Sequence, residues 1–335
     1  MIRRIPPLAT MAVLALALAA CADESADPEP EPTAAPAPEP TPTPEPIWPL
    51  TGMPAPDGIG ETPVLVVKVD NTGPASPQIG LASADLVVQE LVEGGMTRLA
   101  VMYHSTLPDD VAPVRSVRTS DIGLVLPTGG ALVASGGAER VLRQMDDAGL
   151  TVLTEGEPGF SRMGGRSAPY NVAVDLERLA AEVPGLGHPD QPYLPWAGPD
   201  DEPPAGTPVT SFEAAFSSAH TTRWEWDGAV WVRTRDLAAD GDTFDPDTVV
   251  VLRVAIRDAG YTDPAGNFVP ETVLEGSGDA LLFTDGTLIQ GRWSKDGPAA
   301  AFELADDAGD DLTVPPGHTW IELVPENGDV TWAES

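Results

Sequence analysis

The sequence predicts an α+β or mixed α/β protein, in which a mixed N-terminal domain is followed by a β-rich, mainly antiparallel C-terminal domain. Helical and strand-like apolar patterns alternate in the first half of the chain, whereas short apolar runs separated by turn residues fill the second half. A Pro- and Gly-rich stretch without periodicity, residues 184–208, separates the two patterns. This stretch places the domain boundary near residue 205.

Residues 1–20 have the pattern of a lipoprotein signal peptide. Two arginines near the start precede an apolar run that is shorter than the roughly 20 residues of a membrane span. The run ends in the lipobox-like sequence Leu18-Ala19-Ala20-Cys21. We expect cleavage before Cys21 and attachment of a lipid to its thiol. The alternative is an ordinary signal peptide followed by a chance cysteine.

Residues 21–46 are expected to form a disordered, extended tether. They consist mostly of Pro, Glu, Ala and Thr and offer little to bury. Cys21 is the only cysteine of the chain, so an internal disulfide and thiol chemistry in the folded part are excluded. The folded part then divides into a mixed domain at 47–204 and a β-rich domain at 205–335.

The N-terminal domain is expected to contain four strands and two helices. Apolar, β-branched runs that end at polar or glycine residues predict the strands, and apolar residues at helical spacing before Gly149 predict the first helix. We expect strands at 63–70, 85–92, 97–104 and 131–135, and helices at 138–148 and 174–183.

The C-terminal domain is expected to consist mainly of hairpins. Asp-Gly and Asn-Gly pairs at 227–228, 285–286 and 327–328 favour two-residue turns. The tryptophans of this half should belong mostly to the core, although an exposed subset could stack on sugars. We expect strands at 223–226, 229–235, 248–254, 280–284, 287–293, 319–324 and 330–332.

The charge of the chain argues against one class of partner. The sequence has 52 acidic and 18 basic residues and a formal net charge of −34. Such a chain repels nucleic acid, and it repels anionic lipids and wall polymers except at a local basic site. Nucleic acid is therefore not expected as a partner. In so acidic a chain, two arginines close together indicate a candidate local basic site.

Arg115 and Arg118 are the main candidates for ligand binding. If a helix covers 116–126, both guanidinium groups lie near its N-terminus, where free N–H groups and two Arg side chains would bind a carboxylate or phosphate. The alternative is that both arginines pair inside the protein and only hold the fold. The acidic candidates for such pairing are Asp85, Glu90 and Glu93.

The expected ligand site is a crevice at the ends of the first strands, where polar side chains of an α/β sheet commonly face a ligand. Its Arg side chains would hold an anionic group, and its other side chains would orient that group. Glu90 and Glu93 are also weak candidates for an acid/base pair, although turn capping explains them equally well. The crevice residues are Asp70, Asn71, Glu93, Arg98, Arg115, Arg118 and Asn171.

No cofactor is expected, and a metal site has little support. Asp240, Asp242, Asp245 and Asp247 offer oxygens that Ca²⁺ prefers, but the loop lacks the Gly and the distant Glu of an EF-hand. A solvated acidic loop is therefore favoured. The four histidines show no zinc spacing, and no P-loop, dinucleotide-binding or G-x-S-x-G motif is present.

Short segments in a fixed order over residues 48–332 carry a family resemblance. In the first half they include Val69-Asp70-Asn71, Glu93-Gly94-Gly95-Met96-Thr97-Arg98, Pro113-Val114-Arg115-Ser116-Val117-Arg118 and Ala168-Pro169-Tyr170-Asn171. In the second half they include Gly276-Ser277-Gly278-Asp279-Ala280, Gly291-Arg292-Trp293-Ser294-Lys295 and Pro316-Gly317-His318-Thr319-Trp320-Ile321. Together they resemble the YerB-type lipoproteins, a family labelled as a domain of unknown function. Tyr170 and His318 depart from the family pattern, in which a His and a longer basic residue are expected.

The resemblance implies an extracytoplasmic lipoprotein of two domains and no established reaction. We therefore expect a cell-envelope protein, anchored through Cys21 to the outer face of the cytoplasmic membrane, that binds a cell-wall fragment or a small anion. No catalytic motif is recognised, so a binding role is favoured. One alternative is a hydrolase or transferase that acts on cell-wall material through Glu90 or Glu93. The other is a structural protein that docks another envelope protein.

Overall fold

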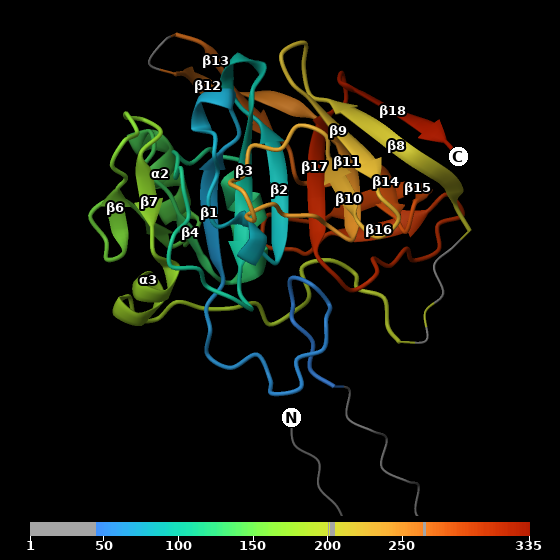
Figure 1. The fold of residues 1–335 in the computed structure, drawn as a ribbon, viewed down its shortest axis with the longest axis horizontal. Coiled ribbons are helices and arrows are strands. Elements are labelled where there is room, and N and C mark those ends of the chain that lie inside the picture. The colour runs from blue at the N-terminus through green and yellow to red at the C-terminus, as the bar shows by residue number, and fades with distance from the viewer. Residues whose placement is uncertain (1–44, 200, 202–204, 264–265) are drawn as a thin grey trace, which may run out of the picture. The chain divides into compact units, whose positions relative to one another are not determined.

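Figure 1 shows the protein as a computed structural model, which describes residues 45–199, 201, 205–263 and 266–335. These residues belong to one compact unit built around a large mixed β-sheet. Among them, no helix has the length and apolar character needed to cross a membrane. Cys21, the expected signal peptide and nearly all of the expected tether lie outside the described residues.

The centre of the sheet consists of strands that are buried on both faces. In β11 (Thr248–Val254), Val249 and Val251 pack into one core, whereas Val250 and Leu252 pack into a second core on the opposite face. Because side chains alternate across a strand, a strand covered on both faces favours apolar residues at every position. This accounts for the long apolar runs of β1 (Leu65–Asp70), β2 (Leu86–Leu91), β3 (Thr97–Tyr103) and β17 (Thr319–Pro325).

The sheet has fourteen strands, twelve of which follow in the order β10-β9-β8-β15-β14-β11-β17-β2-β3-β1-β4-β5. Strand β16 is added beside β15, and β18 beside β8. Two small sheets pair β12 with β13 and β6 with β7. The remaining bounds are β4 Ala131–Val133, β5 Val152–Leu153, β6 Phe160–Arg162, β7 Val172–Val174, β8 Thr207–Ala215, β9 Thr221–Trp226, β10 Trp231–Arg233, β12 Ile256–Thr262, β13 Phe268–Thr272, β14 Gly276–Thr284, β15 Thr287–Lys295, β16 Glu303–Asp306 and β18 Asp329–Glu334.

The two halves of the chain share this sheet. Strand β17 pairs in parallel with β2, so that Thr319 lies opposite Leu86 and Glu322 lies opposite Gln89. Strand β17 also pairs in parallel with β11, and Figure 1 shows β2 and β17 side by side at the middle of the molecule. The division into 47–204 and 205–335 stays a prediction.

The expected α+β or mixed α/β class with a mixed N-terminal domain is wrong, because the protein is mainly β. The described residues contain only three α-helices beside eighteen strands. The helix expected at 138–148 is confirmed as α2 (Glu139–Asp147), and α3 (Leu176–Glu182) replaces the longer helix expected at 174–183, whose start belongs to β7. The third helix is the five-residue α1 (Asp121–Val125).

The helix considered over 116–126 is present only from Asp121 onward, because the start of this segment bonds to its neighbours instead. The amide of Arg115 donates to the carbonyl of Lys68 at 2.7 Å, and the amide of Ser135 donates to the carbonyl of Arg115 at 3.0 Å. The backbone here satisfies its hydrogen bonds with segments next to the sheet, so α1 begins only at Asp121. Neither Arg115 nor Arg118 therefore lies on a helix.

The two faces of the sheet are covered in different ways. Helices α1 and α2 cover one face, where Leu124 and Met145 join the core. On the other face, Phe212 of β8 and Trp224 of β9 pack in the same core as Val249, so the end of the sheet folds over its own face. Most tryptophans of the second half are buried, which confirms their expected core role, whereas Trp332 is 38% exposed.

Candidate functional site

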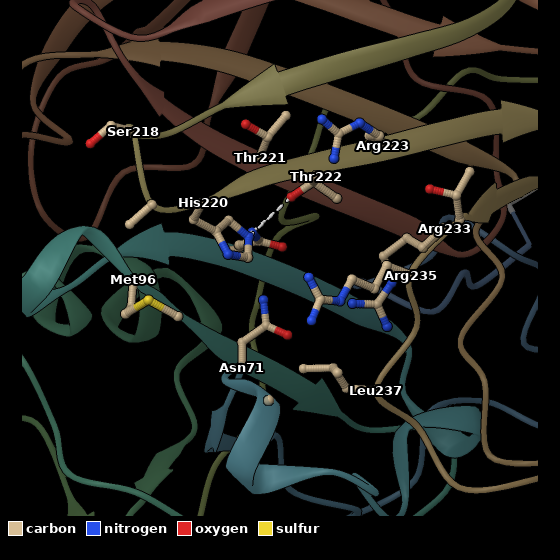
Figure 2. Close-up of a pocket in the computed structure, with 14 residues that line it drawn as sticks. Asn71, Met96, Ser218, His220, Thr221, Thr222, Arg223, Arg233, Arg235 and Leu237 are labelled. Carbon is tan, nitrogen blue, oxygen red and sulfur yellow. Dashed lines mark hydrogen bonds between the residues drawn. The ribbon is translucent and has the colours of Figure 1, made fainter.

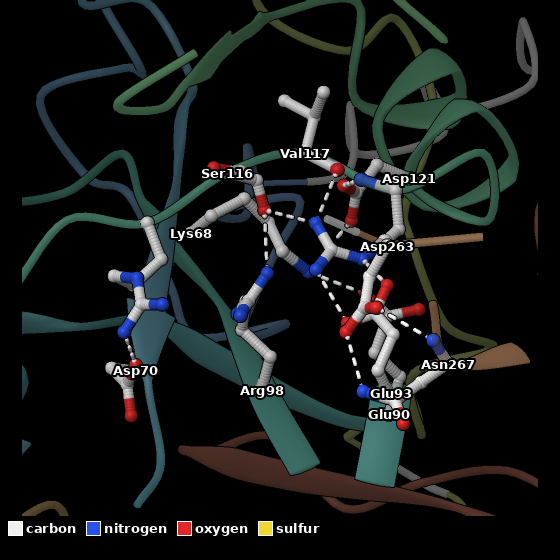
Figure 3. A network of polar contacts seen from close by, with 12 residues as sticks. Lys68, Asp70, Glu90, Glu93, Arg98, Ser116, Val117, Asp121, Asp263 and Asn267 are labelled. Carbon is white, nitrogen blue, oxygen red and sulfur yellow. Dashed lines mark hydrogen bonds and ion pairs between the residues drawn. The ribbon is translucent and has the colours of Figure 1, made fainter. Parts of the chain in front are cut away.

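The charged residues predicted to form a crevice meet at the ends of the first three strands. In the register of the sheet, Arg98 of β3 lies opposite both Asp70 of β1 and Glu90 of β2. Figure 3 shows Arg98 and Glu90 among polar contacts that include Ser116 and Asp121, with Asp70 to one side. The sequence therefore indicated correctly that these charged groups lie together, and their partners decide whether any is free for a ligand.

Glu90 lies in a fully buried ion cluster. The Lys68 ammonium is 2.6 Å from Glu90 Oε1 and 2.7 Å from Asp121 Oδ1, and all three side chains are fully buried. Burial raises the pKa of the Glu90 carboxyl, and the Lys68 charge opposes that rise. A carboxylate without solvent contact and with a salt-bridged lysine is placed to hold the strands together rather than to transfer protons.

Glu93 and Arg118 form a two-pronged ion pair. Arg118 donates from Nε to Glu93 Oε1 at 2.6 Å and from Nη2 to Glu93 Oε2 at 2.5 Å. Its backbone amide donates to Asp121 Oδ2 at 2.7 Å, which ties the pair to the Lys68 cluster. Glu93, the candidate acid or base, and Arg118, the candidate anion-binding residue, are therefore bonded to each other. This agrees with the alternative that the arginines pair inside the protein.

The other arginines of the predicted crevice also have partners. Arg115 forms an ion pair with Asp70, and its guanidinium lies 5.2 Å from the centre of the Tyr170 ring. Arg98 donates to the carbonyl of Ser116 at 2.9 Å. Burial, followed by the charges of the two neighbouring arginines, lowers the pKa of Arg98 to about 10. Asn171 lies apart from this network.

Two amides of the predicted set have different surroundings. Asn171 Oδ1 accepts from Arg162 at 2.7 Å, outside the network. Asn71 is nearly buried and donates to Thr97 Oγ1 at 2.9 Å, but it also lines a cavity on the far side of β1 and β2. Asn71 is therefore a predicted site residue that lines an open cavity.

The acidic loop shows no metal-binding arrangement. Asp242 accepts from the amide of Gly80 at 2.9 Å, and Asp247 accepts from the amide of His318 at 2.7 Å. Asp240 and Asp245 are exposed. In the described part of the chain, no three His, Cys, Asp or Glu side chains come close enough together to hold a metal ion.

The cavity beside Asn71 has a volume of about 280 Å³ and lies between the first strands and the β9–β10 region of the second half. Figure 2 shows Asn71 facing His220, Arg233 and Arg235 across it. We call it the Arg pocket, defined by Asn71, Gln89, His220, Thr222, Arg223, Arg233 and Arg235. Its lining includes three arginines and no Asp or Glu.

One wall of the Arg pocket consists of neutral hydrogen-bonding groups. Gln89 Nε2 donates to Thr222 Oγ1 at 2.9 Å and lies 2.8 Å from His220 Nε2. Burial, followed by the charges of Arg233 and Arg235, lowers the pKa of His220 to about 4. The Gln89 Oε1 atom is buried and has no partner among the described residues.

The arginines of the pocket differ in how they are paired. Arg223 pairs with Glu213, and Arg233 pairs with Asp236 while its guanidinium lies 4.3 Å from the centre of the Trp320 ring. Arg235 is exposed and is the one Lys or Arg of the described residues with neither an ion pair nor a hydrogen bond. The pocket thus offers a free guanidinium next to a buried one.

A buried carboxyl lies near Arg233. Glu322 is fully buried and accepts a hydrogen bond from Trp224 Nε1 at 2.9 Å. Burial raises its pKa to about 7, although the Trp224 hydrogen bond and the Arg233 charge oppose the rise. Arg233 is therefore held by surrounding groups, whereas Arg235 has no such support.

The sequence patterns did not identify the Arg pocket, because its residues come from segments far apart in the chain. Only the antiparallel pairing of β9 and β10 and the parallel pairing of β2 and β17 bring them together. One signal was present, since Arg233 and Arg235 are two residues apart in an acidic chain. Alternation along an extended segment would have placed both on one face.

This protein has a mainly β fold in which two sequence blocks share one sheet. That fold defines its class, which is a family of unknown function. The models described as "Protein of unknown function (DUF3048)" match in order: the N-terminal domain over residues 50–188 and the C-terminal domain over residues 212–321. The chain belongs to this family.

The relatives confirm the resemblance to YerB-type lipoproteins. The chain is 27% identical over 293 residues to YerB of Bacillus subtilis (strain 168), whose name describes it as a lipoprotein, and the match covers 83% of this chain and 86% of YerB. The crystal structure of the YerB protein from Bacillus subtilis has the same fold, with a TM-score of 0.71 and 21% identity. That match covers 85% of this chain and 99% of the YerB chain.

Proposed function

We propose that this protein is a cell-envelope lipoprotein that binds a small anionic ligand in the Arg pocket. The observation that supports this most directly is the unpaired Arg235 in a chain with a formal net charge of −34. Where carboxylates are so abundant, an arginine without one beside a second arginine favours an incoming carboxylate or phosphate.

The rest of the pocket suits the remainder of such a ligand. Asn71, Gln89 and Thr222 offer amide and hydroxyl groups, which fix orientation through hydrogen bonds. The volume of about 280 Å³ is at the small end of ligand pockets. The ligand is therefore a small anion or the anionic end of a longer molecule.

The proposed location rests on the N-terminal sequence and on the relative. Residues 18–21 match a lipobox, and YerB is named as a lipoprotein. We infer that Cys21 carries the lipid and that the folded part lies on the outer face of the cytoplasmic membrane. Cell-wall fragments and other extracytoplasmic anions are then the ligands within reach.

A hydrolase or transferase that uses Glu90 or Glu93 is less well supported. Glu90 is fully buried against Lys68, and both oxygens of Glu93 are bonded to Arg118. A general acid or base must reach the proton that it transfers. We therefore favour binding without turnover.

The test is a titration of the purified protein with inorganic phosphate, small carboxylates, muropeptides and teichoic-acid fragments, read by thermal shift and calorimetry. A ligand at 100 times its Kd stabilises the native state by about 2.7 kcal/mol. We expect an anion to bind, Arg235→Ala to weaken it at least tenfold, and the control Arg143→Ala to leave it unchanged. Binding that survives Arg235→Ala, or no binding of any anion, would overturn the proposal.

A further inference from the structure

Trp332 is the exposed tryptophan of the second half. It is 38% exposed, and among the large apolar side chains of the described residues only Phe268 is more exposed. In the pairing of β18 with β8, Trp332 lies opposite Phe212, whose ring is buried in the core. Trp332 is therefore the strand neighbour of a core residue, and part of its side chain is open to solvent.

The open side of the indole borders a polar groove of about 660 Å³. Across the groove, β14 and β15 present Asp279, Gln290 and Arg292. The Asp279 carboxylate pairs with Arg292 at 2.9 Å, and both side chains are more than half exposed, at 73% and 57%. Gln290 is exposed, and its side chain makes no hydrogen bond with any described residue.

The strand that carries Trp332 is held in place from within the groove. Arg253 of β11 donates to the carbonyls of Glu326 and Gly328, both at 2.8 Å. These carbonyls belong to the turn between β17 and β18, so Arg253 fixes the start of β18. A platform that is ordered before a ligand arrives loses less entropy on binding.

The charge of the groove is opposite to that of the Arg pocket. Its lining contains two arginines, of which Arg292 is paired and Arg253 is bonded to carbonyls. It also contains four acidic residues: Asp279, Asp307, Glu326 and Asp329. Excess negative charge disfavours an anion, so this groove does not share the ligand class of the Arg pocket.

We propose that this groove, which we call the Trp332 groove, binds a neutral carbohydrate chain. A sugar ring has an apolar face of C–H groups that would stack on the Trp332 indole. Its hydroxyls would bond to the planar polar groups of Asp279, Gln290 and Arg292. The residues of the groove are distinct from those of the Arg pocket.

The experiment titrates the purified protein with neutral oligosaccharides, N-acetylglucosamine tetramer and maltotetraose, by calorimetry and by iodide quenching of tryptophan fluorescence. We expect one of them to bind and to protect a tryptophan from iodide. Trp332→Ala should weaken that binding at least tenfold, and Phe268→Ala, the matched change of the other exposed apolar side chain, should leave it unchanged. No binding of either sugar to the unaltered protein would overturn the proposal.

A second pair of variants keeps the test decisive if Trp332→Ala unfolds. Trp332→Phe keeps an aromatic face and should bind with intermediate affinity, and Gln290→Ala changes only an exposed side chain and should weaken binding several-fold. Full affinity in both would overturn the proposal. Arg235→Ala should leave sugar binding intact, so the failure of the anion site and the failure of the Trp332 groove are distinguishable.

Discussion

The arginines at the ends of β1, β2 and β3 differ from those of the Arg pocket in what they contact. At the ends of β1, β2 and β3, Arg115 and Arg118 are bound to carboxylates of the protein itself. In the Arg pocket, Arg235 has no carboxylate, and the lining contains no Asp or Glu. Charge that is already neutralised stabilises the fold, whereas charge left open can select a ligand.

Burial separates the two regions as well. The Lys68 cluster has no solvent contact, so its charges lose hydration that only their partners replace. The Arg pocket keeps solvent at Arg235, so its charge costs little until a ligand arrives. Substitutions in the first region should therefore act on stability, whereas substitution of Arg235 in the second should act on binding.

The largest effect is expected from Lys68→Met. The change leaves Glu90 and Asp121 as two buried carboxylates without a cation, which should lower the free energy of unfolding by about 3–5 kcal/mol. Urea unfolding followed by circular dichroism measures the loss. The variant should regain stability on mild acidification, because protonation removes the two uncompensated charges. A loss below about 1 kcal/mol would mean that the cluster does not hold the strands together.

The next effect concerns pH. The pKa of folded His220 is about 4, below its usual 6.5, so the unfolded chain binds the proton more readily and stability falls as pH drops from 6.5 through 4. At pH 5 the neutral His220 ring should lower the free energy of unfolding by about 2 kcal/mol. His220→Gln should remove the contribution of this histidine to the pH dependence. The free energy of unfolding should then fall less steeply between pH 6.5 and 4.5. Identical slopes in both proteins would contradict the buried neutral ring.

Glu322 should act in the opposite direction. Its folded pKa of about 7 lies above its usual 4.5, so its stabilising contribution is complete below pH 4.5 and disappears as pH rises through 7. Glu322→Gln should therefore flatten the stability profile between pH 4.5 and 7.5. The same unfolding series measures both variants, and their opposite effects separate the two groups.

A smaller effect should distinguish charge from geometry in the Arg pocket. Arg235→Lys keeps the positive charge but loses the planar fork that binds a carboxylate or phosphate through two hydrogen bonds. We expect it to retain part of the anion affinity that Arg235→Ala loses, with unfolding free energies of both variants within about 0.5 kcal/mol of the parent. Calorimetry and urea unfolding test this. A large stability loss in either variant would place Arg235 with the structural arginines.

The smallest effect is expected at an exposed pair on α2. Arg143 and Glu139 form an i,i+4 ion pair in which both side chains are mostly exposed, at 62% and 89%. Such a pair contributes about 0.3–0.5 kcal/mol. Arg143→Ala should therefore change the urea midpoint only slightly, which also qualifies it as the control for the Arg235 variants.

The sequence by itself determined a substantial part of this protein. Apolar runs located β1, β2, β3 and β11, helical spacing located α2, and ordered short motifs located the family. It also brought Asp70, Glu93, Arg115 and Arg118 together correctly as one polar group. These features are local, because each depends on residue spacing within a few turns or strands.

Tertiary structure alone decided the fold class, the partners and the open site. The segment before α1 is extended because its backbone bonds with Lys68 and Ser135, a choice that no local pattern encodes. The parallel pairing of β17 with β2 joins the halves and brings Gln89 next to Thr222. Whether an arginine is paired or free depends on which distant carboxylates the sheet brings within reach, and that is a property of the register between strands rather than of the order of residues.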